Sequence, residues 1–248
     1  MRFNILSVFL ILITGMFPAL KSFAFSGAGH GFIENKGQIV DLLYKPNPDV
    51  LFLLNNPGLN VQLRKTGFSY DVYTVEYKLN QNHMISQNTH PYSRVHHSDS
   101  LIPVLNFQRI DITLEGADPA CTIVPSEPLP DYLNYFTSVA PPEGIKNVRQ
   151  FCKITYQNIY PGIDLDFFTD KSHNYKYNFI IHPGADINDI RLKIEGPDHI
   201  SLIHDTLKFG TRFGDVEELI PESYYIYNNS RIEIKAEFRK KQKRFMVF

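Results

Sequence analysis

The segment from residue 156 to residue 194 constrains the fold most strongly, because strands and turns follow one another in it without interruption. Its apolar side chains Ile163, Leu165 and Phe167 alternate with polar residues, which is the period-two pattern of a half-buried strand. The run from 175 to 181 repeats this pattern, and the polar sequence TDKSHN separates the two. Loops this short connect antiparallel strands, so the segment predicts a β-hairpin.

Two Pro-Gly pairs bracket this hairpin, Pro161-Gly162 and Pro183-Gly184. Each suits a type II turn, because proline fixes the first central φ and glycine supplies the positive φ of the second. Asp186 follows the second pair, and its carboxylate is placed to cap a single helical turn.

The rest of the chain continues in the same way, without sustained helical periodicity or a repeat of fixed length. Alternation on both sides of residues 65–67 predicts a second hairpin, with Gly67 as the left-handed residue of its turn. Further strands are expected at 50–54, 110–114, 132–136, 148–156, 190–194, 200–203, 206–209, 224–227 and 232–238. We therefore expect an all-β fold, an antiparallel β-sandwich-like domain of many short strands, over residues 32–240.

Two stretches interrupt the strands. Residues 79–100 lose their apolar character and are interpreted as a polar loop rather than a metal site, because no other ligand stands at a fixed spacing. Four histidines gather there, at His83, His90, His96 and His97. Residues 117–131 carry several prolines, which leave room only for short edge strands and mark a candidate boundary between two lobes.

The N-terminus has the features of a secretory signal peptide. An arginine at position 2 precedes an apolar core over residues 5–17, and small residues occupy Ser22 and Ala24. We expect residues 1–24 to be removed, 25–31 to form a flexible lead, and the product to be periplasmic, extracellular or on the cell surface. No later segment has the roughly 20 apolar residues of a membrane-spanning helix.

The charge balance argues against nucleic acid as a partner. The 248-residue chain has a formal charge of −1, which becomes −3 when Arg2 and Lys21 leave with the signal peptide. Protein surfaces that bind nucleic acid are strongly basic, and the one basic cluster, at 239–244, is interpreted as a solvated edge. Residues 241–248 read as a basic and apolar tail without a strand partner.

Cys121 and Cys152 are the only cysteines. Each alternates in phase with apolar neighbours, so each is expected to face the interior. Export would permit a disulfide between them. Two buried thiols that do not meet are the alternative, and the sequence leaves both open.

Asp164, Asp166 and Asp170 are the best candidates for a metal site, because Asp164 and Asp166 share a strand face and could offer oxygen ligands to Ca²⁺. A solvated polar face explains them more simply, since an Asp-x-Asp-x-Asp-Gly loop is absent. The sequence also has no Gly-x-Ser-x-Gly elbow. We therefore expect neither a cofactor nor an enzymatic activity.

Several motifs occur together in this chain. They are FIENKGQ from Phe32, NYF from Asn134, YQNIYPGIDLDFF from Tyr156, YKYNFIIHPGADINDIRLKIEG from Tyr175 and IPESYYIY from Ile220. The combination resembles a domain of unknown function at the N-terminus of large exported proteins of gliding, type IX-secreting Gram-negative bacteria. SBBP-type β-propeller repeats, PKD or similar modules and a sorting domain commonly follow it. The resemblance implies an exported all-β module without an established activity, and a chain truncated before those repeats.

Two functions are compatible with these features. The first is a structural or adhesion module of a secreted or cell-surface protein, whose protein or glycan partner is unknown. The second is a carbohydrate-binding module, which would need an exposed aromatic platform. Tyr73, Tyr77 and Tyr92 lie off the main apolar stripes and are the candidates for that platform.

Overall fold

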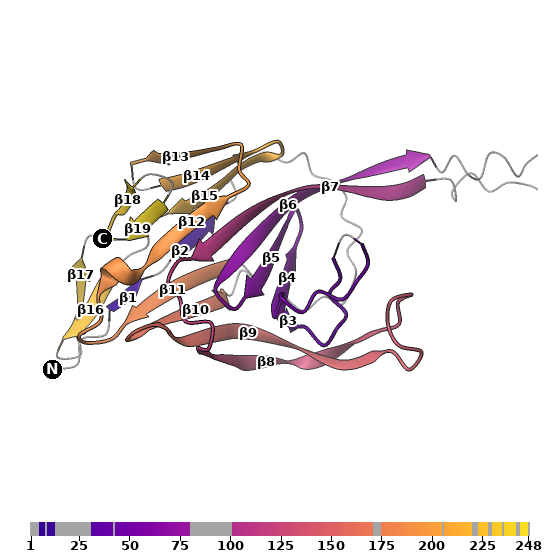
Figure 1. Ribbon diagram of the computed structural model, residues 1–248, viewed down its shortest axis with the longest axis horizontal. Helices are drawn as coiled ribbons and strands as arrows, with labels where there is room; N and C mark the ends of the chain where they lie inside the picture. The colour runs from indigo at the N-terminus through magenta and orange to yellow at the C-terminus, as the bar shows by residue number, and fades with distance from the viewer. Residues whose placement is uncertain are drawn as a thin grey trace, which may run out of the picture.

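The fold is all-β and antiparallel, as expected from the sequence, with 68% of the residues in strands (Figure 1). The computed structural model describes residues 5–7, 9–12, 31–41, 43–79, 101–170, 175–204, 206–219, 223–227, 230–234, 236–241 and 244–247. Within these residues no helix is long and apolar enough to cross a bilayer.

One run of neighbouring strands forms the first layer of the domain. In spatial order it contains β3 (Phe32–Glu34), β4 (Phe52–Asn56), β5 (Leu59–Arg64), β6 (Gly67–Leu79), β7 (Leu101–Leu114), β12 (Arg191–Glu195), β19 (Arg244–Val247) and β18 (Phe238–Lys241). Strands that follow one another in the chain are mostly neighbours here, so hairpins build most of this layer.

A second run begins with β8 (Thr122–Tyr135), β9 (Ile145–Tyr160), β10 (Ile163–Thr169) and β11 (Tyr175–Ile181). Beyond β11 lie β1 (Ile5–Ser7) and β2 (Phe9–Leu12), followed by two hairpin groups. These groups are β16 (Ser223–Tyr227) with β17 (Ser230–Ile234), and β15 (Gly214–Leu219) with β14 (Thr206–Thr211) and β13 (His199–Ile203). Strand β9 also pairs with β3, so it joins the two runs.

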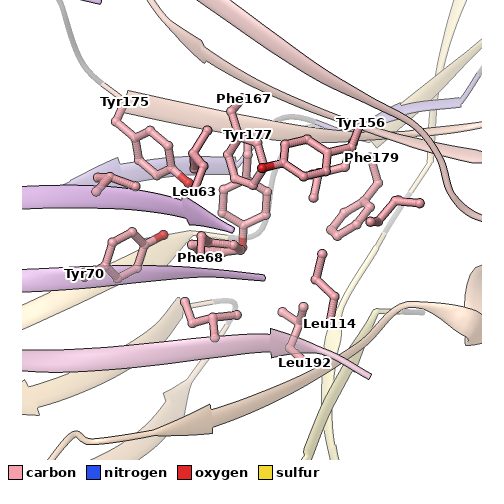
Figure 2. Close-up of a cluster of buried hydrophobic side chains, with 14 of the residues drawn as sticks. Leu63, Phe68, Tyr70, Leu114, Tyr156, Phe167, Tyr175, Tyr177, Phe179 and Leu192 are labelled. Carbon is pink, nitrogen blue, oxygen red and sulfur yellow. The ribbon is translucent and has the colours of Figure 1, made fainter. Parts of the chain in front are cut away.

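Aromatic side chains from both runs fill the space between them (Figure 2). The Phe68 ring of β6 lies 5.3 Å from Phe167 of β10 and 5.2 Å from Tyr177 of β11, measured between centroids. Tyr70 of β6 meets Tyr175 of β11 edge to face at 6.0 Å. Such pairs add about 0.5–1.5 kcal/mol each beyond the burial of their area, so this cluster holds the two layers together.

The hairpin expected from the sequence is confirmed. Strands β10 and β11 pair from Ile163 opposite Ile181 to Thr169 opposite Tyr175. Gly162, in the turn before β10, has a φ of +70°, as the type II assignment requires. The short helix η4 (Ile187–Asp189) is capped by the carboxylate of Asp186, which accepts a hydrogen bond from the backbone N–H of Asn188 at 2.9 Å.

Gly67 plays a different role from the one expected, because its φ is not in the left-handed region. A Cβ atom at this position would lie 2.3 Å from the carbonyl oxygen of Ile112 in the neighbouring strand. The glycine is therefore needed for the close approach of β6 and β7, and the turn geometry does not depend on it.

The proline-rich stretch 117–131 forms most of a single 14-residue strand, β8, and the expectation of short strands there is wrong. Among the described residues β8 pairs only with β9, so it lies at an edge, where proline removes no ladder hydrogen bond. The ladder shifts register between Pro128 and Tyr132. The prolines thus bend an edge strand at a place where the sequence suggested a lobe boundary.

Within the tail expected at residues 241–248, residues 244–247 form strand β19. Strand β19 pairs with β18 and with β12, where Leu192 lies opposite Phe245. The unpaired apolar end predicted from the sequence is therefore wrong. A local pattern could not reveal this partner, because Leu192 lies more than fifty residues earlier in the chain.

We predict that Gly162→Val lowers the free energy of unfolding more than Ile163→Val does. Valine at a φ of +70° is strained, and its Cβ would also lie 3.1 Å from the Cβ of Ala185, so a loss of about 2–3 kcal/mol is expected. Ile163 is fully buried, and trimming one methylene there should cost about 1 kcal/mol. Denaturant unfolding measures both values, and equal midpoints would contradict the turn assignment.

Candidate functional site

The three aspartates proposed as metal ligands each have a protein partner of their own. Asp164 Oδ2 lies 2.8 Å from Nε2 of His182, and its Oδ1 accepts a hydrogen bond from the backbone N–H of Asn158 at 2.7 Å. Asn158 has a φ of +53°, and the ladder between β9 and β10 shifts register beside it. Asp164 therefore stabilises the irregular end of this hairpin.

The other two aspartates form ion pairs with lysines. Asp166 is buried, lies 2.7 Å from Nζ of Lys153 and accepts a hydrogen bond from the Thr155 hydroxyl at 2.6 Å. Asp170 lies 3.0 Å from Nζ of Lys176. Over the part of the chain that the structure describes, no three His, Cys, Asp or Glu side chains are grouped as a metal site would require. The four histidines of the 79–100 loop lie outside the described residues.

The two cysteines are free thiols. The register of β8 on β9 places Thr122 opposite Gln157, so Cys121 lies beside the far end of this ladder while Cys152 is five residues back along β9. At about 3.3 Å per residue the separation is roughly 16 Å, whereas bridged cysteines need Cα atoms within about 7 Å. Burial, with the nearby charge of Asp118, raises the pKa of the Cys121 thiol.

The FIENKGQ motif has a structural role in this fold. Asn35 donates hydrogen bonds from its side chain to the carbonyl oxygens of Asn47 and Val50, at 2.8 and 2.6 Å. Its own Oδ1 accepts from the backbone N–H of Gly37 at 2.8 Å. The motif therefore ties β3 to the loop that leads into β4.

Two of the three candidate platform tyrosines lie on a ribbon formed by the outer parts of β6 and β7. This ribbon, residues 73–79 paired with 101–107, projects well beyond the rest of the first layer (Figure 1). Tyr77 is exposed, while the Tyr73 hydroxyl donates to the carbonyl oxygen of Asn56 at 3.1 Å. Tyr92 lies outside the described residues.

One face of this ribbon is apolar along its whole length. Directly paired residues share a face, and the four pairs on this face are Tyr73 with Phe107, Val75 with Leu105, Tyr77 with Pro103, and Leu79 with Leu101. Five of these side chains are exposed large hydrophobics, with Leu79 at 63% and Leu105 at 57%. We call this surface the ribbon face.

The ribbon face is not a continuation of the core side of the sheet. In the inner part of β6 the buried apolar residues are Phe68, Tyr70 and Val72, whereas the ribbon face begins with Tyr73. The apolar positions thus change from even to odd numbers, which moves them to the opposite side of the strand. The ribbon face therefore points away from the core.

The one fully buried carboxyl group in the described core is Glu218, on β15. Its Oε1 accepts a hydrogen bond from the Tyr70 hydroxyl at 2.8 Å, and its Oε2 accepts from the Tyr177 hydroxyl at 3.0 Å. Both partners are neutral, so hydrogen bonds alone offset the desolvation of the carboxyl group. Burial raises its pKa from 4.5 to about 7, and the two hydrogen bonds oppose that rise.

Glu218 in turn affects the tyrosines around it. Burial and the adjacent carboxylate raise the pKa of both Tyr70 and Tyr177 well above 10. The Tyr175 hydroxyl faces Tyr70 across the same cluster (Figure 2) but makes no hydrogen bond of acceptable geometry within the described structure. Within the described residues, the arrangement is thus a proton-binding group enclosed by the core.

The sequence reasoning missed Glu218. The sequence contained only a weak indication that Glu218 is buried, namely its place on the same strand face as the apolar Val216, which is also buried. A pattern of this kind does not show which charged residue will enter the core. The partner Tyr70 lies 148 positions away.

We predict that stability depends on pH through Glu218. Because its pKa is raised on folding, the protonated carboxyl contributes stability that is complete below pH 4.5 and is lost as the pH rises through about 7. The loss should be on the order of 3 kcal/mol. Glu218→Gln keeps the neutral shape and should remove this dependence. Urea unfolding across this pH range measures it, and parallel profiles for both proteins would contradict the assignment.

We also predict that Tyr177→Phe destabilises the fold by about 1–2 kcal/mol, because it removes a hydrogen bond to a buried carboxyl group. Tyr175→Phe is the matched control, since it removes from the same cluster and strand a hydroxyl that does not bind Glu218. Its cost should be smaller. Thermal unfolding compares them, and equal losses would show that packing alone holds this cluster.

The comparisons with known proteins agree with the described domain. A family model described as a domain of unknown function, DUF7948, matches residues 32–248. Neither a curated protein nor a solved structure matches this chain significantly. The matched region begins at Phe32, the first residue of β3, and continues through β19. This chain therefore belongs to the DUF7948 family, a domain family of unknown function.

Proposed function

We propose that this domain is a non-catalytic structural or adhesion module of an exported surface protein, and that the ribbon face is its contact surface. The observation that carries the proposal is the apolar ribbon face itself, on a hairpin that projects from the body of the domain (Figure 1). Contiguous exposed apolar surface marks interaction sites on soluble domains. The aromatic core holds this hairpin at its base and so gives it a rigid support.

Protein is the partner that fits this surface best. Aliphatic side chains dominate it, with Leu79, Leu101 and Leu105 all more than half exposed. Leucine side chains gain free energy by burial against another apolar surface, at about 25 cal/mol per Å². A sugar ring needs a flat aromatic face, and Tyr77 is the one exposed tyrosine among the described candidates. Carbohydrate binding through Tyr77 is the second candidate function.

The expectation of export supports the same proposal from the sequence side. The signal-peptide features of residues 1–24 favour a location outside the cytoplasm. The motifs from FIENKGQ to IPESYYIY resemble those of domains found in exported proteins of type IX-secreting bacteria, upstream of SBBP-type repeats. In that setting the domain would present the ribbon face to a neighbouring protein at the cell surface.

We predict that Leu101→Ser combined with Leu105→Ser weakens binding of the purified, fluorescently labelled protein to intact producing cells. Two leucines at about 1 kcal/mol each correspond to at least about a tenfold loss of affinity. The matched control is Ile102→Ser with Val104→Ser, which makes the same changes on the opposite face of β7.

Binding that is equal for all three proteins, or absent in the unaltered one, would contradict the proposal. A glycan array separates the second candidate. Saturable, sugar-specific binding that Tyr77→Ser abolishes would assign the surface to carbohydrate. Circular dichroism of each variant confirms that the fold is retained.

A further inference from the structure

A strand-wide slot separates β11 from the strands that continue the second layer. On one side β11 pairs with β10 along its full length. On its other side lie neither β15 nor β16, but residues 5–7 and 9–12. These same residues pair with β16 and β15 on the far side of the slot. The strands β1 and β2 therefore connect two parts of the sheet.

The pairing is antiparallel on both sides of these two strands. Ile5 lies opposite Ile181 of β11 and Tyr225 of β16. Four residues later, Phe9 lies opposite Tyr177, and Ile11 lies opposite Glu218 of β15. The slot accordingly has the length of about eight residues of extended backbone. Strands β11, β15 and β16 supply the residues that pair with a strand in it.

The two walls of the slot are already linked on the core side. Tyr177 lies on β11 at one side of the slot and Glu218 on β15 at the other. Their side chains meet across it, where the Tyr177 hydroxyl donates a hydrogen bond to Oε2 of Glu218 with an oxygen–oxygen distance of 3.0 Å. Tyr70, from the first layer, binds the other oxygen of the same carboxyl group. This link holds the walls about two strand spacings apart, roughly 10 Å, which is the width that one inserted strand requires.

The residues that fill the slot are those that the sequence predicts to be removed on export. Without them, β11, β15 and β16 would each present unpaired N–H and C=O groups. Unpaired backbone groups beside an apolar core are costly, and open edges recruit other strands. We propose that the exported domain accepts, in this slot, an apolar β-strand donated by another polypeptide.

This binding mode is strand addition, in which main-chain hydrogen bonds supply affinity and alternate side chains supply specificity. The donor should be an extended segment of about eight residues without proline and with mainly apolar side chains, as in NILSVFLILI at residues 4–13. The inference rests on removal of residues 1–24. It does not depend on the ribbon face, which lies on a different part of the sheet.

The test uses the protein as its producing cells export it, with intact mass confirming that residues 1–24 are gone. The probe is a synthetic peptide with the sequence of residues 4–13 between solubilising lysines. It should bind saturably at one to one and slow hydrogen exchange of amides in both 175–181 and 214–219. The control peptide carries Leu10→Pro, which removes a ladder donor and should bind at least about tenfold more weakly.

Three results would overturn the proposal. They are retention of residues 1–24 in the exported protein, absence of peptide binding, and amides in 175–181 that are equally protected before the peptide is added. If the exported domain is only partly folded alone, the peptide should restore its β-sheet circular dichroism, and failure to do so counts against the slot. The Leu101→Ser, Leu105→Ser protein should bind the peptide normally, which separates this test from that of the ribbon face.

Discussion

The hydrogen-bonded contact between Glu218, Tyr70 and Tyr177 is the constraint on which the rest of the fold depends. It brings together β15, β6 and β11, and Glu218 lies 148 positions from Tyr70 and 41 from Tyr177 in the chain. A carboxyl group in an apolar core is tolerated when it is protonated or well hydrogen-bonded. The fold supplies both conditions, since two tyrosine hydroxyls bind the group and burial raises its pKa to about 7. The edge-to-face and tilted contacts of the Phe68 ring with Phe167 and Tyr177 then fix how the two layers meet (Figure 2).

The same two strands serve the core and the proposed contact surface. The inner parts of β6 and β7 bury Phe68, Tyr70 and Ile112 against the second layer. Past Val72 the apolar positions change sides, and Tyr77, Leu79, Leu101 and Leu105 on the side to which they move are exposed. A simple extension of the core would have kept its phase, so the ribbon face is separate from the core. The core anchors the ribbon, and the ribbon carries the leucines that a partner would bury.

The sequence predicted what local patterns determine. The β10–β11 hairpin, the positive φ of Gly162 and the Asp186 cap all follow from neighbouring residues, and all are confirmed. The errors concern long-range pairing. Residues 244–247 pair with β12, and the proline-rich edge strand β8 extends along β9. Glycine is required at position 67 because the backbone of Ile112 in the neighbouring strand leaves no room for a Cβ atom.

Of the candidate site residues, Tyr77 lies on the ribbon face as an exposed ring, while the aspartates form separate polar contacts. Glu218 could not be selected, because only the assembled core distinguishes it from the neighbouring Glu217, whose carboxylate pairs with Lys208.

The most direct measurement of this account is the titration of the Glu218 carboxyl group in the folded protein with its slot occupied. Carbon-13 NMR of glutamate side chains follows the group, and the signal that disappears in Glu218→Gln identifies it. The account predicts a single glutamate that titrates near pH 7, together with slow exchange of the Tyr70 and Tyr177 hydroxyl protons. Titration of Glu218 near its ordinary value of 4.5 would show a solvated carboxylate. The buried link between β6, β11 and β15 would then be wrong.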